Sequence, residues 1–247
     1  MIARLALAEG GMAYEPVFLD IHVRKSQQQP DYVRLNPNMT VPTLVMGDRI
    51  LDQSRDIAAQ ALGTSEAALD QETRAWLDRH YALPIEQLTF GRLLARNRLA
   101  RIMVPRYLDA TRRRLLERAK EHPDLAKVYE ARAAAFAERL RVLDPPAVAE
   151  VAEKRRAEAI ELMDGLEQTL GDGRAVIVPP AYGVADVVFT VFLARMEFAG
   201  LGAEIPQRPA LARYWRAVQA RPSFAAADIW TRFHPLRLIG GILGFSR

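Results

Sequence analysis

The chain contains no cysteine among its 247 residues. It therefore offers no disulfide, no thiolate ligand for a metal ion and no thiol nucleophile. Histidine is also scarce, and no two histidines have the i, i+4 spacing that places both imidazoles on one helix face. The four are His22, His80, His122 and His234. The sequence therefore predicts no metal site.

Long hydrophobic runs are missing as well. No apolar stretch approaches the roughly 18 residues that a membrane-spanning helix needs, and no basic and apolar secretion signal precedes the first predicted hairpin. The apolar fraction of 50% and the charged fraction of 26% are ordinary for a globular protein. We therefore expect a cytoplasmic protein, and the chain length favours two modest cores over one large core.

The chain also lacks an excess of acidic charge, since its formal net charge is +4. Arginines crowd between Arg92 and Arg118, a pattern that can attract phosphates or nucleic acid. Aromatic residues are almost absent from this segment and it has no motif that reads a DNA groove, so we expect no nucleic-acid partner. We favour a solvated helix face, with a nearby bound anionic ligand as the alternative.

The first part of the chain mixes helical and strand patterns. Residues 1–9 have an apolar helical face and are followed by two glycines, which predicts a helix that ends there. The stretch "EPVFLDIHV", residues 15–23, is rich in β-branched and apolar residues and predicts a strand. The stretches "VPTLVM" and "RIL" predict two short strands joined by a tight turn at Gly47, with a helix at residues 54–62.

The remainder of the chain has helical patterns and no convincing strand. We therefore predict a mixed domain of helices and strands at residues 1–63, a linker, an all-α domain at 70–228 and an apolar tail at 229–247. The tail contains an apolar decapeptide, residues 236–245, that could dock on a membrane surface. We favour packing of this tail over the helical domain or at a dimer contact.

Two helices of the all-α domain have distinctive patterns. Apolar residues recur on one face of the helix that ends at Gly171. They are Val148, Val151, Ala159, Met163, Leu166 and Leu170. The segment "VADVVFTVFLARM" is apolar on nearly all sides, which predicts a fully buried helix. We assign a structural cap to Gly183 at its N-cap and Asp186 in its first turn, where a carboxylate meets the positive helix end.

The stretch "TVPTLVMGDRILDQS" offers backbone groups more than reactive side chains. A cis bond between Val41 and Pro42 would turn the Val41 amide and carbonyl outward, where a short extended peptide could pair with them. Ser54, with Gln53 beside it, offers a hydroxyl and the positive end of a helix to a carboxylate. The simpler alternatives are a proline that blocks a sheet edge and an ordinary serine N-cap. Together these residues favour a receptor for a short acidic peptide.

The same features occur in order in a known family. "LNPNMTVPTLVMGDRILDQSRDI" resembles the glutathione-binding segment of glutathione S-transferases, and "YGVADVVFTVFLARM" resembles the N-capped helix of their helical domain. "RPALARYWRAVQARPSF" resembles their closing helix. Within the family, "ERAKEHPDLAKVYEARA" and "FLARMEF" are most similar to the tetrachlorohydroquinone reductive dehalogenase type. The resemblance covers almost the whole chain and implies a thioredoxin-like domain, without its first strand, followed by an all-helical domain.

The resemblance implies a binding mode for glutathione, which would be a co-substrate with no metal involved. The Val41 backbone would pair with the cysteinyl residue of glutathione beside Pro42, and Gln53 and Ser54 would hold the γ-glutamyl end. Either Arg24 or Lys25 would meet the glycyl carboxylate.

The resemblance also implies an activity and partners. The helical domain would supply a pocket for a small hydrophobic or halogenated electrophile, with His80, Tyr81 and Phe90 as candidate lining residues. The protein would conjugate glutathione to this electrophile or remove halide from it reductively, and it would form a homodimer. A non-catalytic transferase-fold module that binds a ligand or partner is the alternative.

The chain departs from the family at its start. The family's first strand, and the turn whose serine, tyrosine or cysteine activates the glutathione thiol, have no counterpart before Met1. We therefore expect the catalytic residue upstream of Met1. A clipped sequence or misplaced start is our preferred explanation, because a real deletion would leave backbone groups unpaired inside the sheet. The family's capping serine or threonine is glycine at position 183, a change that costs a few tenths of a kcal/mol.

Overall fold

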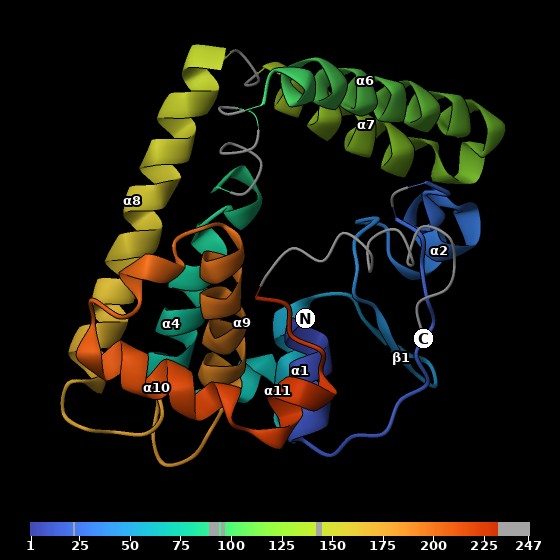
Figure 1. Cartoon of the computed structure of the whole chain (residues 1–247). Helices are drawn as coiled ribbons and strands as arrows, with labels where there is room; N and C mark the ends of the chain where they lie inside the picture. The colour runs from blue at the N-terminus through green and yellow to red at the C-terminus, as the bar shows by residue number, and fades with distance from the viewer. Residues whose placement is uncertain (22, 89–93, 95–96, 142–144, 232–247) are drawn as a thin grey trace. The chain divides into compact units, whose positions relative to one another are not determined.

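Figure 1 shows the computed structural model of the chain. The structure describes residues 1–231, with the exception of 22, 89–93, 95–96 and 142–144. The described residues form two compact units. The first contains Met1–Pro16, Leu44–Ile85 and the described part of Arg155–Pro235, and the second contains the described parts of Val17–Thr43 and Glu86–Lys154.

The first unit begins with the predicted N-terminal helix, which is confirmed as α1 (Ile2–Glu9). Its buried face contains Leu5 and Leu7 and packs against α3 (Ser54–Ala61). Gly10, the C-cap of α1, lies directly against the end of α3, because a Cβ atom at this position would lie 1.8 Å from the Ala61 carbonyl oxygen. The approach of the two helices therefore requires a residue without a side chain.

The predicted hairpin is also confirmed, as strands β1 (Leu44–Met46) and β2 (Arg49–Leu51). The strands are antiparallel, and Val45 lies opposite Ile50. Gly47 occupies the turn with a φ of 58°, a backbone conformation that glycine adopts without steric cost. The chain then enters α3 within three residues of β2, so the hairpin directly positions the N-terminus of that helix.

The strand predicted at residues 15–23 was wrong. Its described residues form no strand, and Val17 and Phe18 are 79% and 63% exposed. A strand is stable only when its amides and carbonyls pair with a neighbour. The two-stranded sheet of β1 and β2 provides no such neighbour for this segment within the described residues. A composition rich in β-branched residues was therefore not sufficient to make a strand.

Helices make up most of the first unit. Their bounds are α4 (Gln71–Ala82), α9 (Val184–Phe198), α10 (Pro209–Gln219) and α11 (Pro222–Ala226), with the short 3-10 helices η2 (Glu66–Ala68) and η4 (Gly202–Glu204). α9 packs against α1, α3, α4 and α10, and nearly all of its side chains are buried. This confirms the helix predicted to be buried on all sides.

The second unit is built around a pair of long helices, α6 (Arg98–Glu121) and α7 (Ala126–Arg141), which pack along each other (Figure 1). The other elements of this unit are η1 (Ser26–Gln28), α2 (Pro30–Leu35) and η3 (Pro123–Leu125). Its core includes Val33 of α2, Leu115 of α6 and Tyr129 of α7. The Tyr129 hydroxyl donates to the Gln28 carbonyl at 3.0 Å, which ties η1 to the helix pair.

The long helix α8 (Pro145–Leu170) begins in the second unit and ends in the first. The apolar face that the sequence predicts for this helix is buried at five of its six positions, and Val151 is partly exposed.

Each compact unit contains residues from both predicted domains, and the predicted boundaries at 1–63 and 70–228 stay a prediction. Residues 232–247 of the predicted tail lie outside the described residues. No helix among the described residues is long and apolar enough to cross a membrane.

Candidate functional site

The N-terminus of α3 carries two of the predicted glutathione-binding residues. Gln53 is its N-cap residue, is exposed, and makes no capping hydrogen bond with its side chain. The Gln53 carbonyl accepts the amide of Ile57 at 3.0 Å, which begins the helical hydrogen-bond pattern. The amides of the first turn therefore have no acceptor within the helix and point toward the N-terminal end, where the helix dipole is positive. This arrangement suits a carboxylate.

Ser54, the first residue of α3, is held by a residue that lies far away in the sequence. Its Oγ lies 2.7 Å from the Tyr81 hydroxyl of α4. Loss of hydration around the phenol raises the pKa of Tyr81, and the hydrogen bond with Ser54 partly opposes the rise. The phenol therefore keeps its proton at neutral pH and can donate it to Ser54. The Ser54 hydroxyl hydrogen is then free to point toward a ligand.

Arg55 lies beside the Tyr81 ring. Its guanidinium pairs with Glu66 at 2.7 Å and Asp78 at 3.2 Å, and its central carbon lies 5.7 Å from the centre of the Tyr81 ring. These contacts fix the guanidinium among groups of this unit. Arg55 therefore positions Tyr81, and its charge is largely compensated by the two carboxylates.

His80 and Tyr81 are neighbours on α4 with different surroundings. His80 is 5% exposed and its ring makes edge contacts with Phe189 and Phe192 of α9, whereas Tyr81 is 39% exposed. Burial, together with the positive charge of Arg195, lowers the pKa of His80 to about 4. His80 is therefore neutral at pH 7 and part of an aromatic cluster. The third predicted pocket residue, Phe90, lies outside the described residues.

The Val41-Pro42 segment belongs to the second unit. The peptide bond is cis, and Val41 is 44% exposed. Among the described residues, no hydrogen-bond partner takes the Val41 amide or carbonyl. The preceding carbonyl, of Thr40, accepts the Tyr32 hydroxyl at 2.5 Å and the Asn36 side-chain amide at 2.9 Å. The chain is therefore anchored just before Val41, while the Val41 backbone stays available.

Sequence reasoning did not single out Tyr32 and Asn36 as supports of this segment. Both side chains also lie within hydrogen-bond distance of the Thr43 hydroxyl, at 2.8 Å and 3.0 Å. Asn36 is fully buried, and an asparagine in that environment normally has hydrogen-bond partners. Its place in the "LNPN" motif was the one sequence signal that could have pointed to it.

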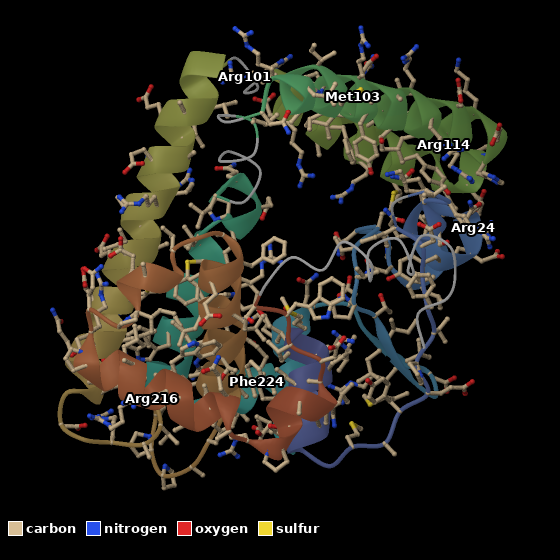
Figure 2. The ribbon with its side chains drawn as sticks, in the orientation of Figure 1. Arg24, Arg101, Met103, Arg114, Arg216 and Phe224 are labelled. Atoms are coloured by element: carbon tan, nitrogen blue, oxygen red, sulfur yellow. The ribbon has the colours of Figure 1, made fainter. Side chains whose placement is uncertain are left out.

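Arg24 and Lys25 differ in how available they are to a ligand (Figure 2 labels Arg24). Lys25 is only 6% exposed, and its ammonium lies 3.8 Å from the centre of the Tyr107 ring. Burial lowers the pKa of Lys25, and the nearby Arg114 lowers it further. Arg24 is exposed and donates its backbone amide to Asp20 at 3.2 Å. Of the two cations, Arg24 is the one whose charge faces solvent.

The cap of α9 is closed by the protein's own groups. The Gly183 amide donates to Asp186 Oδ2 at 2.9 Å, and the Ile177 amide and the Tyr214 hydroxyl both donate to Oδ1 at 2.9 Å. Asp186 is fully buried, which raises its pKa, and the three hydrogen bonds oppose that rise. Every oxygen of this carboxylate is in use, so the cap is a structural feature.

No group of three or more histidine, aspartate or glutamate residues that could hold a metal ion occurs in the part of the chain that the structure describes. The first unit offers a hydroxyl and helix amides, and the second offers an open backbone segment and a solvent-facing guanidinium. Such groups recognise carboxylates and peptide backbone.

Comparisons with known proteins agree with this chemistry. Residues 1–60 match the family model described as glutathione S-transferase, N-terminal domain. The chain is 33% identical over 246 residues to the tetrachloro-P-hydroquinone reductive dehalogenase of Sphingobium chlorophenolicum, and the match covers 93% of this chain and 91% of that protein. It is 26% identical to the ganglioside-induced differentiation-associated protein 1-like 1 of Mus musculus, with 90% and 68% covered.

Solved structures share the fold at lower identity. A beta-etherase from Sphingobium sp. strain SYK-6 has a TM-score of 0.65 and 18% identity, and the match covers 92% of this chain and 93% of that chain. A glutathione transferase from Phanerochaete chrysosporium, in complex with oxidized glutathione, has a TM-score of 0.62 and 17% identity, with 92% and 88% covered. The predicted fold class, a thioredoxin-like domain with a helical domain, is thereby confirmed.

Proposed function

Because the chain belongs to the glutathione S-transferase family, we propose that it binds glutathione and transfers its sulfur to a small hydrophobic or halogenated electrophile. The observation that carries the proposal is the N-terminus of α3. It presents uncapped amides and a serine hydroxyl that lies 2.7 Å from the Tyr81 hydroxyl. A γ-glutamyl carboxylate is the ligand that this arrangement suits best.

The remaining contacts follow from the chemistry of the tripeptide. The open amide and carbonyl of Val41 would pair with the cysteinyl backbone, as a neighbouring strand would. Arg24 would meet the glycyl carboxylate, in preference to Lys25, whose ammonium is buried against Tyr107. Gln53 would add an amide beside Ser54.

Two reactions fit this binding mode. In conjugation, the glutathione thiolate forms a carbon–sulfur bond and the halide leaves with the bonding electron pair. In reductive dehalogenation, a second thiolate attacks the sulfur of the conjugate and forms the disulfide of oxidized glutathione. The electron pair of the broken carbon–sulfur bond then takes a proton. Both reactions release one halide per turnover, but only the second consumes two glutathione molecules.

We favour reductive dehalogenation for halogenated hydroquinones, because the relative that is 33% identical over nearly the whole chain is a reductive dehalogenase of that substrate class. The 247 residues hold no cysteine, so the second thiol would come from a second glutathione molecule. The expectation that the activating residue lies upstream of Met1 stays a prediction. The intact mass of the protein from its own cells tests it, since a mass above 27.7 kDa would identify additional sequence.

Calorimetric titration with glutathione, followed by turnover of tetrachlorohydroquinone, tests the function. We expect saturable glutathione binding and release of chloride together with an equal amount of oxidized glutathione. Chloride release without oxidized glutathione would support conjugation instead. Binding without chloride release would support the alternative of a non-catalytic module, and no glutathione binding would overturn the whole proposal.

A homodimer in the cytoplasm is the proposed state of the protein. The family is built of soluble enzymes that use reduced glutathione, and the cytoplasm keeps thiols reduced. Light scattering coupled to size exclusion measures the oligomeric state directly. A mass of one chain at micromolar concentration would contradict the dimer.

A further inference from the structure

The start of α6 exposes large apolar side chains on one face. Leu99, Ile102 and Met103 are 66%, 52% and 53% exposed. Their i, i+3, i+4 spacing places them side by side on the helix surface. Single exposed apolar residues are ordinary, but three adjacent ones on a helix indicate a surface that another apolar phase covers.

These residues do not belong to the core of the second unit. The buried residues of α6 are Thr111, Leu115 and Ala119, which begin two turns further along the helix and lie on its opposite side. Leu115 and Ala119 pack with Tyr129 of α7. One face of α6 therefore packs against α7, while the opposite face stays exposed to solvent.

Two cations flank the exposed apolar residues. Arg98 and Arg106 are both exposed, and neither forms an ion pair or a side-chain hydrogen bond with another described residue. We refer to Arg98, Leu99, Ile102, Met103 and Arg106 as the α6 face. Figure 2 labels Met103 on this helix.

The α6 face also lies in the most positively charged region of the chain. Residues 98–141 contain twelve basic and six acidic residues, a formal net charge of +6, against +4 for all 247 residues. The rest of the chain is therefore slightly negative. A partner that approaches α6 experiences a positive field that the remainder of the chain does not provide.

Three kinds of partner can be weighed against this surface. A second copy docked through the same face would place Arg98 and Arg106 near the arginines of the partner's identical patch, because a two-fold contact pairs identical patches. A nucleic acid would satisfy the arginines, but it would leave the three apolar side chains uncovered and find few aromatic rings to stack on. An anionic lipid surface matches both properties, since acyl chains cover apolar residues and headgroups pair with arginine.

We propose that the α6 face docks on anionic membranes, with α6 lying in the plane of the headgroups. Leu99, Ile102 and Met103 enter the acyl boundary, and Arg98 and Arg106 pair with lipid phosphates. Arg101 is not part of this contact, because its Nε donates to the Leu94 carbonyl at 2.7 Å. The attachment is peripheral and reversible, and it does not depend on glutathione binding.

The absence of cysteine allows a direct test of which residue touches the lipid. A Met103→Cys variant carries a single thiol, to which an environment-sensitive fluorophore is attached. We expect its emission to shift to the blue on vesicles of phosphatidylcholine with 30% phosphatidylglycerol, and not on pure phosphatidylcholine. A Val17→Cys variant, labelled at a position of the same unit that is 79% exposed, is expected to show no shift. A protein that binds the vesicles without a shift at position 103 would overturn the proposal.

Vesicle sedimentation measures the contribution of each part. We expect Ile102→Gln/Met103→Gln and Arg98→Gln/Arg106→Gln each to lower the partition coefficient roughly tenfold, and added salt to weaken binding of the unmodified chain. Arg74→Gln/Arg216→Gln removes two exposed arginines elsewhere and is expected to bind nearly as well. Circular dichroism of each variant verifies the fold.

Two results would overturn the proposal. One is that both α6 variants pellet like the unmodified chain while a truncation after Phe233 does not, which would assign the contact to the tail. The other is retention of the unmodified chain on double-stranded DNA with no binding to anionic vesicles, which would assign the charge to nucleic acid.

Discussion

Three helices of the first unit begin in three different ways. α9 is capped from within, because Asp186 of its first turn accepts the Gly183 amide. α11 is stabilised by another element, since Glu9 of α1 accepts two hydrogen bonds from Arg221 and one from Ser223. α3 has no side-chain cap at all. This protein can therefore neutralise a helix N-terminus with its own carboxylates, and it leaves the N-terminus of α3 open.

The difference follows burial and function. The start of α9 is buried, and an unpaired amide or carboxylate there would lose its hydration without replacement. The start of α3 is exposed at Gln53, so water can satisfy its amides until a ligand replaces the water. An open helix start therefore costs little in stability and remains available to a carboxylate.

The largest effect is expected on the free energy of unfolding, at the capped N-terminus of α9. Asp186→Ala leaves two amides and the Tyr214 hydroxyl without their acceptor, and we expect it to lower the free energy of unfolding by about 3 kcal/mol. Urea denaturation followed by circular dichroism measures this loss. Asp31→Ala, at a fully exposed carboxylate, is the control and is expected to change it by less than about 0.5 kcal/mol. Equal losses of unfolding free energy in both variants would contradict the assignment of Asp186 as the cap that stabilises α9.

At the uncapped N-terminus of α3, a substitution is expected to change glutathione affinity more than stability. Ser54→Ala removes a donor to the γ-glutamyl carboxylate, and we expect glutathione affinity to fall by roughly tenfold, with less than about 1 kcal/mol lost in unfolding free energy. Calorimetric titration measures the affinity. Ser65→Ala is a matched control, because Ser65 is an exposed serine that precedes η2 and makes no capping hydrogen bond. A loss of stability without a loss of affinity would show that Ser54 is only structural.

A smaller effect on glutathione affinity is expected at Tyr81, which contacts Ser54 instead of the ligand. Tyr81→Phe keeps the ring but removes the hydroxyl that lies 2.7 Å from Ser54, and we expect glutathione affinity to fall by roughly threefold. In the double variant with Ser54→Ala, the second substitution should have little further effect, because Tyr81 acts through Ser54. Additive losses in this cycle would show that Tyr81 acts on the ligand independently.

The smallest effect is expected at α11, and it depends on pH. The hydrogen bonds from Arg221 lower the pKa of Glu9 below its ordinary value of 4.5, although burial opposes this. The stability that ionised Glu9 provides is therefore fully present above about pH 4.5 and is lost as the pH falls through its folded pKa. We expect the difference in unfolding free energy between the unmodified chain and Glu9→Gln to shrink over that acidic range. A difference that grows on acidification would contradict the assignment.

Elements that depend on local pattern could be predicted from the sequence. The apolar periodicity of α8, the all-round apolar character of α9 and the glycine turn of the hairpin are encoded within a few neighbouring residues. The strand expected at residues 15–23 could not be judged in this way, because a strand depends on a partner that its own sequence does not specify.

The candidate site was predictable only in part, for the same reason. Gln53 and Ser54 follow from their place at the start of a helix. The Ser54–Tyr81 pair and the burial of Lys25 against Tyr107 join residues far apart in the chain, so they arise only from packing. The preference for Arg24 over Lys25 therefore needed the structure.

The contact between Gly10 and Ala61 has a consequence for variation in this chain. A scan of all substitutions at position 10 should return almost no tolerated residue, since any Cβ atom would collide with a backbone carbonyl that cannot rotate away. α3 carries that carbonyl at one end and Ser54 at the other. A variant that survived by displacing α3 would therefore be recognised by altered ligand preference, at a position with no ligand contact of its own.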